Sequence, residues 1–345
     1  MPGPYLFIPP YLLKRLAAHP TPELSRSAAQ TLLLDQQVRT QRAQTSPRSS
    51  VRQPAMAESP ELERAIHDAK NGTGLPGAPV RTEGKPATGD EAVDEAYDYM
   101  GMTWQMFHDV FGRNSIDGAG MPLVGSVHYG QDYDNAFWNG SQMVFGDGDG
   151  RIFNRFTVAL DVIAHELTHG VIDSEGGLNY QGQAGALNES LADVFGILTK
   201  QFHLQQRASQ ADWLIGVGLF LPGVNARGLR SMAAPGSAYD DPALGKDPQP
   251  GHMRDYVNTL EDNGGVHINS GIPNHAFYLA ATTLGGHAWN KAGKVWYDTL
   301  KSGKLKPDAD FSSFARLSTE IASVQGSAVA SAVRNAWDDV GVKHD

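Results

Sequence analysis

The segment at residues 165–169 reads His-Glu-Leu-Thr-His and matches the pattern H-E-x-x-H. On an α-helix, residues at positions i and i+4 lie about 40° apart around the axis, so His165 and His169 aim their imidazoles at one point. Such a pair could hold one zinc ion. The alternative is an amphipathic helix that carries two incidental histidines. The apolar residues around the motif predict a buried helix in either case.

A second acidic segment begins 20 residues after His169 and offers the third protein ligand that a catalytic zinc requires. Glu189 is the candidate, with Asn188 beside it in the chain. Asp193, four residues later on the same helical face, could accept the remaining N–H of a metal-bound histidine. Taken alone, Glu189 and Asp193 would be a solvated acidic face. Behind an H-E-x-x-H helix, we interpret them as part of a metal site.

The amino-acid composition limits which side chains can bind a metal ion and which classes of partner the protein can have. The chain has 345 residues, no cysteine and a formal net charge of −10. Without cysteine, a transition metal must be held by histidines and carboxylates. The sequence contains no apolar run long enough for a membrane anchor, and residues 1–16 lack the layout of a secretory signal. The acidic body argues against nucleic acid as a partner, and we expect neither a nucleic-acid nor a membrane partner.

Charge is uneven along the chain. Residues 1–55 contain seven Lys or Arg and two acidic residues, a net charge of +5, which leaves −15 on the remainder. This basic leader could dock on the acidic body, or it could be a flexible, solvated tail. Composition does not choose between the two.

Hydrophobic periodicity predicts a β-containing half followed by a helical half. A helix is expected at 90–111, followed by strands at 123–129, 134–138 and 142–145. Further helices are expected at 157–173, 186–203, 268–284, 287–302, 310–324 and 326–340. In the leader we expect a short amphipathic segment at 13–18, a helix at 22–38 and an exposed linker from about 40 to 60.

Several blocks, in order, resemble the thermolysin-like metallopeptidase family. They lie at 135–139, 143–150, 165–169, 177–181, 185–189, 229–232 and 262–271. The family implies an α+β, two-lobed endopeptidase with one zinc per chain, a β-rich N-terminal lobe, a mainly α-helical C-terminal lobe and the zinc cleft between them. The Pro-Pro-Tyr segment at 9–11 and the short leader are similar to the protealysin-like subgroup, whose precursors carry a compact prosegment. We therefore expect a prosegment and linker at 1–50, with its end between 40 and 60, an N-terminal lobe at 51–174 and a C-terminal lobe at 175–345.

The resemblance assigns chemistry to named residues. Glu166 is implied as the general base that takes a proton from a zinc-activated water and returns it to the leaving amine. The developing oxyanion is implied to be stabilised by His267 and Tyr180, with Asp262 orienting His267.

Substrate contacts are also implied by the resemblance. Asn135 and Ala136 pair with the peptide as an added strand, and Arg230 holds a substrate carbonyl and supports Glu189. An apolar pocket on the leaving-group side predicts cleavage before Leu, Phe, Ile or Val; its wall is formed by Phe153, Phe156, Val162, Ile215 and Leu229. The alternatives stay open: Arg230 could be a structural ion-pair partner, and the apolar five could be plain core.

The chain departs from the family where better-known members bind structural calcium. Asp161 and Asp212 match, but three expected carboxylates are replaced, by Lys200, Leu214 and Val217. Because calcium takes six to eight oxygen ligands, we expect structural calcium to be absent or weakly bound, with Lys200 pairing instead with Asp161 or a neighbour. Arg227 stands where a second calcium site expects Asp, and we interpret 146–150 as a tight hairpin turn.

The partners expected are polypeptide substrates and the chain's own prosegment, in a monomer. We expect Tyr5–Leu12 to pack on the catalytic lobes and to block or shape the cleft until cleavage between about Arg39 and Pro60 frees it; a folding aid that never touches the site is the alternative. The family is largely exported, but without a recognisable signal both intracellular accumulation and a non-classical export route stay open. Rival functions are a closed structural zinc site and a zinc hydrolase of non-peptide substrates.

Overall fold

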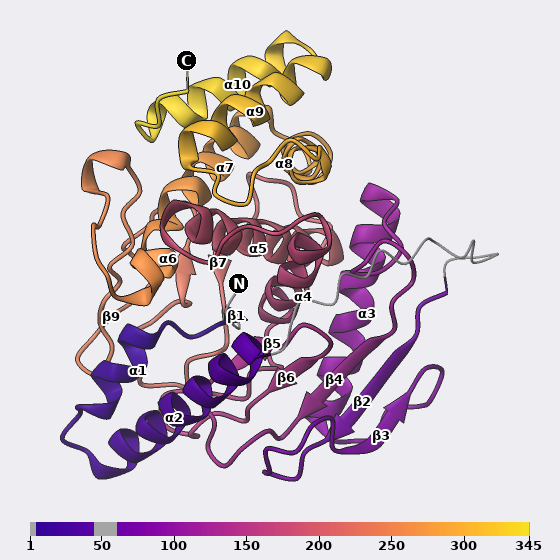
Figure 1. Cartoon of the computed structure of the whole chain (residues 1–345), viewed down its shortest axis with the longest axis vertical. Helices are drawn as coiled ribbons and strands as arrows, with labels where there is room; N and C mark the ends of the chain where they lie inside the picture. The colour runs from indigo at the N-terminus through magenta and orange to yellow at the C-terminus, as the bar shows by residue number, and fades with distance from the viewer. Residues whose placement is uncertain (1–4, 45–60, 345) are drawn as a thin grey trace. The chain divides into compact units, whose positions relative to one another are not determined.

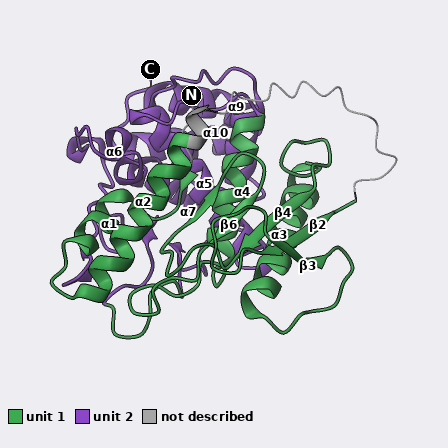
Figure 2. Cartoon of the chain, turned by 60° about the horizontal axis from the view of Figure 1, so that its bottom comes forward, with its two compact units in different colours: residues 1–174, 218–224 green, residues 175–217, 225–345 purple. Residues whose placement is uncertain are grey.

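The computed structural model describes residues 5–44 and 61–344, and the remainder of the expected linker lies outside them. The chain divides into two compact units, coloured separately in Figure 2. Unit 1 is Met1–Ser174 with Gly218–Val224, and unit 2 is Glu175–Val217 with Asn225–Asp345. Within the described ranges, no helix is both long and apolar enough to cross a membrane.

Unit 1 is built on a six-stranded sheet with the order β1-β5-β6-β4-β2-β3. The strands are β1 (Tyr5–Leu6), β2 (Arg64–Asp68), β3 (Ala78–Thr82), β4 (Leu123–Val127), β5 (Ala136–Trp138) and β6 (Met143–Phe145). Strand β4 runs parallel to β2 and β6, and the other neighbours are antiparallel. The pattern analysis predicted β4, β5 and β6 but missed β1, β2 and β3. The leader therefore supplies the edge strand next to β5.

Among the described residues of unit 1, four helices accompany the sheet. The leader forms α1 (Pro10–Ala17) and α2 (Pro22–Gln44), drawn in indigo in Figure 1, and they are followed by α3 (Glu91–Phe111) and α4 (Leu160–Ser174). Helix α3 packs on β2, β3 and β4, and α4 packs on α3 and β5. The predicted end of the second leader helix near residue 38 was wrong, because the Gln-, Arg- and Ala-rich stretch after it has good helix propensity and continues the helix to Gln44.

The leader is part of the hydrophobic core of unit 1. Leu6 and Val38 share one buried cluster with Tyr133, Phe137 and Val144, among others. Apolar side chains of β1, of the segment that follows it and of the first leader helix are also buried: Tyr5, Leu6, Phe7, Ile8, Leu12, Leu13 and Leu16. A flexible, solvated tail is therefore the wrong interpretation for the described part of the leader.

The segment Gly218–Val224 returns from the second half of the sequence to unit 1. Asn154 donates its backbone N–H to the carbonyl of Leu219 at 2.8 Å, and Leu221 donates to Ile152 at 3.0 Å. These bonds add an irregular strand beside the loop that follows β6.

Unit 2 is mainly helical, with α5 (Gly182–His203) in contact with α6 (Asp262–Asn269), α7 (Gly271–Leu284), α8 (Ala292–Lys301) and α9 (Phe311–Val324). Helix α10 (Ser327–Asp339) packs on α7 and α9. Short strands pair as β7 (Leu214–Ile215) with β8 (Arg230–Ser231) and β9 (Asp240–Asp241) with β10 (Gly245–Lys246), and η1 (Met253–Asp255) is a 3₁₀ turn. The fold is α+β, with a β-containing first unit and a helical second unit.

Candidate active site

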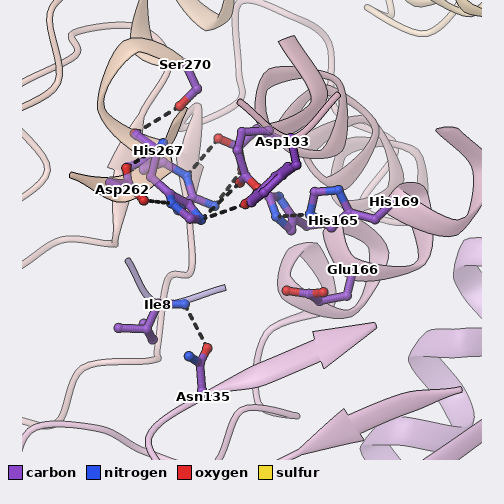
Figure 3. Close-up of polar contacts among 12 residues, drawn as sticks. Ile8, Asn135, His165, Glu166, His169, Asp193, Asp262, His267 and Ser270 are labelled. Carbon is purple, nitrogen blue, oxygen red and sulfur yellow. Dashed lines mark hydrogen bonds and ion pairs between the residues drawn. The ribbon is translucent and has the colours of Figure 1, made fainter. Parts of the chain in front are cut away.

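Helix α4 carries the H-E-x-x-H motif on a fully buried face. The Nε2 atoms of His165 and His169 face each other at 3.1 Å. With a carboxylate oxygen of Glu166, their nearest ligand atoms all lie within 4.8 Å of one another. The three side chains are labelled in Figure 3. The expected convergence of the two imidazoles is confirmed.

This pair of histidines fits a zinc ion. At Zn–N distances of about 2.0–2.1 Å, a tetrahedral zinc holds two ring nitrogens roughly 3.3 Å apart. Two buried nitrogens that face each other at 3.1 Å match the edge of such a tetrahedron. In the absence of a cation, the same distance suits a hydrogen bond between the rings in which one Nε2 carries the proton.

Glu166 is anchored by the strand that lies next to the leader. The backbone N–H of Trp138 in β5 donates to Glu166 Oε2 at 2.9 Å. The bond fixes the plane of the carboxylate beside the histidines. Sequence reasoning missed this contact, because a backbone donor 28 residues away leaves no signal in residue type.

The leader occupies the backbone edge at Asn135 and Ala136. Ile8 donates its N–H to Asn135 Oδ1 at 2.8 Å, as Figure 3 shows. Phe7 donates its N–H to the carbonyl of Ala136 at 3.1 Å. The leader thus adds an antiparallel strand to the two residues that were predicted to read an extended peptide.

Aromatic side chains of the same leader strand cover both histidines of α4. The Tyr5 ring stacks on His169 with a centroid distance of 4.1 Å, and Phe7 meets His165 edge-on at 5.2 Å. The Tyr5 hydroxyl donates to Asp173 Oδ1 at 2.6 Å. The candidate metal ligands of unit 1 therefore lie directly beneath the leader.

Helix α2 fastens the leader to residues 132–135 through side chains spaced four apart. Ser27 donates to the carbonyl of Asp132 at 3.0 Å and also to the carboxylate of Asp134. Thr31 accepts the backbone N–H of Asp134 at 3.0 Å. Burial raises the pKa of Asp134 well above its ordinary value.

Asp35, four residues after Thr31, is the third member of this row. Its carboxylate accepts from the hydroxyl of Tyr133 at 2.6 Å and from Asn135 Nδ2 at 3.1 Å. Burial raises the pKa of Asp35 to about 6, against the opposing influence of Tyr133, Arg39 and Asn135. Ile8 and Asp35 thus hold the Asn135 amide from both ends.

Unit 2 holds a second cluster of the predicted residues. The Tyr180 hydroxyl donates to Glu189 and lies 3.2 Å from His267 Nε2. His267 Nδ1 lies 2.7 Å from Asp262 Oδ1. Burial opposes a charge on His267, but Asp262 and Glu189 outweigh it and raise the imidazole pKa. The expected pairing of Asp262 with His267 is present.

Arg230 is held by Asp193 rather than standing alone. Its Nε and Nη2 atoms donate to the two oxygens of Asp193 at 2.7 and 2.8 Å, and Asn274 donates to Asp193 at 2.8 Å. Asn188, next to Glu189 on α5, is fully buried. Sequence reasoning did not select Asn274, because a lone amide in the first turn of a helix gives no motif.

The five residues of the predicted apolar pocket are buried and fall in both units. In unit 1, the rings of Phe153 and Phe156 lie 5.9 Å apart, and Val162 is on α4. In unit 2, Leu229 donates its backbone N–H to Ile215 at 2.8 Å. Each group is packed as part of its own unit.

Lys200 takes the predicted role of an ion-pair partner at the calcium position. Its ammonium lies 3.1 Å from both oxygens of Asp212 and 3.1 Å from the carbonyl of Leu214. Pairing of Lys200 with a neighbouring acid is thus present, and that acid is Asp212. At 146–150, Asp149 accepts three backbone N–H groups of its own turn, as a tight turn requires.

Two family models match the chain over most of its length. The model described as thermolysin metallopeptidase, catalytic domain, covers residues 38–173, and the model described as thermolysin metallopeptidase, alpha-helical domain, covers residues 176–342.

Known proteins match over nearly the whole chain. An extracellular metalloprotease of Pectobacterium carotovorum subsp. carotovorum is 56% identical over 97% of this chain and 96% of its own length. Protease PrtS of a Photorhabdus strain is 48% identical over 97% and 91%. The solved precursor of protealysin, a metalloproteinase from Serratia proteamaculans, is 56% identical, covers 98% of this chain and 99% of its own, and superposes with a TM-score of 0.89.

Proposed function

The chain belongs to the thermolysin family of metallopeptidases, and from this premise we propose that its leader holds it as a latent precursor by occupying the edge that binds substrate. It is a zinc metalloendopeptidase, which hydrolyses peptide bonds with a zinc-activated water. The observation that carries the proposal is the pairing of Phe7 and Ile8 with Ala136 and Asn135. A leader in this place denies an incoming peptide the same hydrogen bonds.

We assign the zinc ligands as His165 and His169 of unit 1 and Glu189 of unit 2. Zinc, when bound, supplies Lewis-acid chemistry and lowers the pKa of a coordinated water to about 7. Glu166 takes the proton and delivers it to the leaving amine. The Trp138 N–H keeps the Glu166 carboxylate in one orientation throughout.

Charge that develops on the scissile carbonyl is stabilised by two donors, Tyr180 and His267. Asp262, 2.7 Å from His267 Nδ1, favours the protonated ring and leaves Nε2 as the donor. Loss of one such donor costs about 3–4 kcal/mol of barrier.

Arg230 binds a backbone carbonyl of the substrate. Support comes from its ion pair with Asp193, which fixes the guanidinium, and from Asn274, which fixes Asp193. We place Asp193 and Asn188 around the metal ligands as supporting groups. Since the proposed pocket residues are apolar, cleavage before bulky hydrophobic residues follows.

We propose that residues 1–50 form the prosegment and its linker, 51–174 the N-terminal catalytic lobe and 175–345 the C-terminal lobe. The relative from Pectobacterium is named an extracellular metalloprotease, and we propose that this chain is exported and acts as a monomer. Lys200 supports a further proposal, that structural calcium is absent or weakly bound.

The test compares the wild-type chain with Glu166→Ala. Wild type should hydrolyse casein, lose activity to a zinc chelator and lose its leader, as denatured mass spectrometry would show. Glu166→Ala should stay at full length, bind one zinc in native mass spectrometry and hydrolyse nothing, while His165→Ala should lose the zinc. Zinc binding without hydrolysis by the wild type would indicate a structural metal site and overturn the assignment.

A further inference from the structure

The main chain of His267 is held from several directions within unit 2. Its N–H donates to Asp262 Oδ2 at 2.9 Å. Its carbonyl accepts from Ser270 Oγ at 3.0 Å, a contact drawn in Figure 3, and from Gln249 Nε2 at 2.8 Å. Asp262 and Ser270 are close in sequence to His267, whereas Gln249 belongs to a loop 18 residues earlier.

The turn before His267 depends on outside support. Residues 262–265 have φ values of 51°, 51°, 83° and 74°, which is a left-handed turn that includes two residues with side chains. Asp and Asn tolerate this backbone better than other residues with a side chain, but a left-handed non-glycine residue still costs free energy and persists where the surroundings hold it. A bond to the His267 carbonyl restrains the chain at the end of this turn.

The loop that carries Gln249 packs closely against the junction of α6 and α7. A Cβ on Gly271 would lie 2.6 Å from the carbonyl oxygen of Pro250 and 3.0 Å from Gln249 Cβ, so the approach requires glycine. On the other side, Asp247 accepts the backbone N–H groups of Gln249 and Gly236 at 3.1 Å each. The glutamine is therefore fixed before it meets His267.

We propose that Gln249 is a positioning residue for the oxyanion donor His267. Because it is anchored by its own loop, it holds the His267 backbone in place while charge develops on the substrate. A donor displaced by about 1 Å loses much of its effect, of the order of 100-fold in rate. The inference rests on the proposed role of His267.

The experiment replaces Gln249 with leucine, which keeps the volume and removes the donor. The matched control is Gln201→Leu, since Gln201 is a fully buried glutamine of the same unit whose amide forms no hydrogen bond with the described residues. Gly271→Ala, which must displace the loop, is the second variant. Each is activated and assayed with a peptide substrate, with zinc content and unfolding midpoint measured alongside.

We expect Gln249→Leu and Gly271→Ala to lower kcat by about tenfold or more with KM and zinc content unchanged. Affinity for a phosphonamidate peptide, which mimics the tetrahedral transition state, should fall by the same factor as kcat/KM. The control should keep wild-type kcat. If Gln249→Leu merely loses stability and keeps kcat while His267→Ala is inactive, the inference fails alone; if His267→Ala keeps kcat, the role proposed for His267 fails first.

Discussion

The phenol ring of Tyr5 lies flat on the imidazole of His169, with centroids 4.1 Å apart and planes 15° apart. Tyr5 also donates its hydroxyl to Asp173, four residues beyond His169 on the same helix. One leader side chain thus covers a proposed metal ligand and binds the helix that carries it. This contact ties latency to a single residue.

Replacing Tyr5 with alanine should make the precursor leaky. Removing a fully buried aromatic ring costs about 3–5 kcal/mol, so docking of the leader should weaken by about 100-fold or more. In a chain made uncleavable between 45 and 60, peptide hydrolysis should rise well above that of the parent precursor. Tyr5→Phe is the matched control, because it keeps the ring and loses the hydroxyl that binds Asp173. Equal latency in all three chains would mean that Tyr5 does not hold the leader on the site.

The leader should dissociate more readily as pH rises. Burial raises the pKa of Asp35 from 3.8 to about 6, so docking favours the protonated form. Its contribution is complete below about pH 4 and is lost as pH rises through 6, a change of about 3 kcal/mol. After the linker is cut, the leader should leave faster at pH 7.5 than at pH 5, as gel filtration of the nicked complex would show.

Asp35→Asn tests the source of this dependence. The amide imitates the protonated acid, since it can donate to Tyr133 and accept from Asn135. The charged or titratable groups around Asp35 are Arg39 on its own helix and Tyr129 and Tyr133 opposite. The variant should dock with a weaker pH dependence and retain only that of Asp134, which is shifted in the same direction. An unchanged profile would assign the effect to another group.

The helices and the histidine pair of H-E-x-x-H were predictable because the spacing that defines them lies within one short stretch of sequence. Strands β2 and β3 were not, since Arg64–Asp68 has only two apolar residues, adjacent to each other and without the alternation typical of a strand, and Ala78–Thr82 contains a proline. Both become strands only beside β4. The two-residue β1 likewise exists only because β5 offers an edge.

The residues of the site also differ in how far they could be predicted from local sequence. Spacing four apart on one helix selected His165 and His169, the acidic segment 20 residues later selected Glu189 and Asp193, and resemblance selected the remaining residues. Neither could reveal that Trp138 holds Glu166 or that Asp35 holds Asn135, because these contacts join residues 28 and 100 positions apart. Nothing in a local pattern marks a glutamine such as Gln249 as the neighbour of His267.

We propose that the Lys200 ammonium replaces a structural calcium ion, and stability should then be independent of calcium. Lys200 lies 3.1 Å from Asp212 and from the Leu214 carbonyl. A calcium-selective chelator should leave the unfolding midpoint of Glu166→Ala unchanged. In that background Lys200→Ala should lower the midpoint, and added calcium should not restore it. Lys200→Asp places a second carboxylate beside Asp212. If the charge of the ligands determines calcium binding, added calcium should stabilise this variant. An unfolding midpoint of Glu166→Ala that depends on calcium would contradict the proposal that Lys200 replaces the ion.

Unit 1 should lose stability at alkaline pH, because His128 then loses its proton. Its Nδ1 lies 2.9 Å from both oxygens of Asp147 and its Nε2 lies 3.1 Å from Asp90, the cap of α3. The bond to Asp147, supported by Asp90 and against partial burial, raises the pKa of His128 to about 9. The stabilisation is complete below about pH 6.5 and is lost as pH rises through 9.

The unfolding midpoint of Glu166→Ala should therefore fall between these values. The decrease should be small, roughly 2–4 °C at most, because the group is partly exposed and such pairs are worth about 0–1 kcal/mol. His128→Asn is the suitable variant, since asparagine tolerates the φ of +54° at this position. It should lower the midpoint at pH 6 and flatten the profile toward pH 9. If the midpoint of His128→Asn decreased just as steeply, another group would be titrating, because asparagine has no proton to lose between Asp147 and α3.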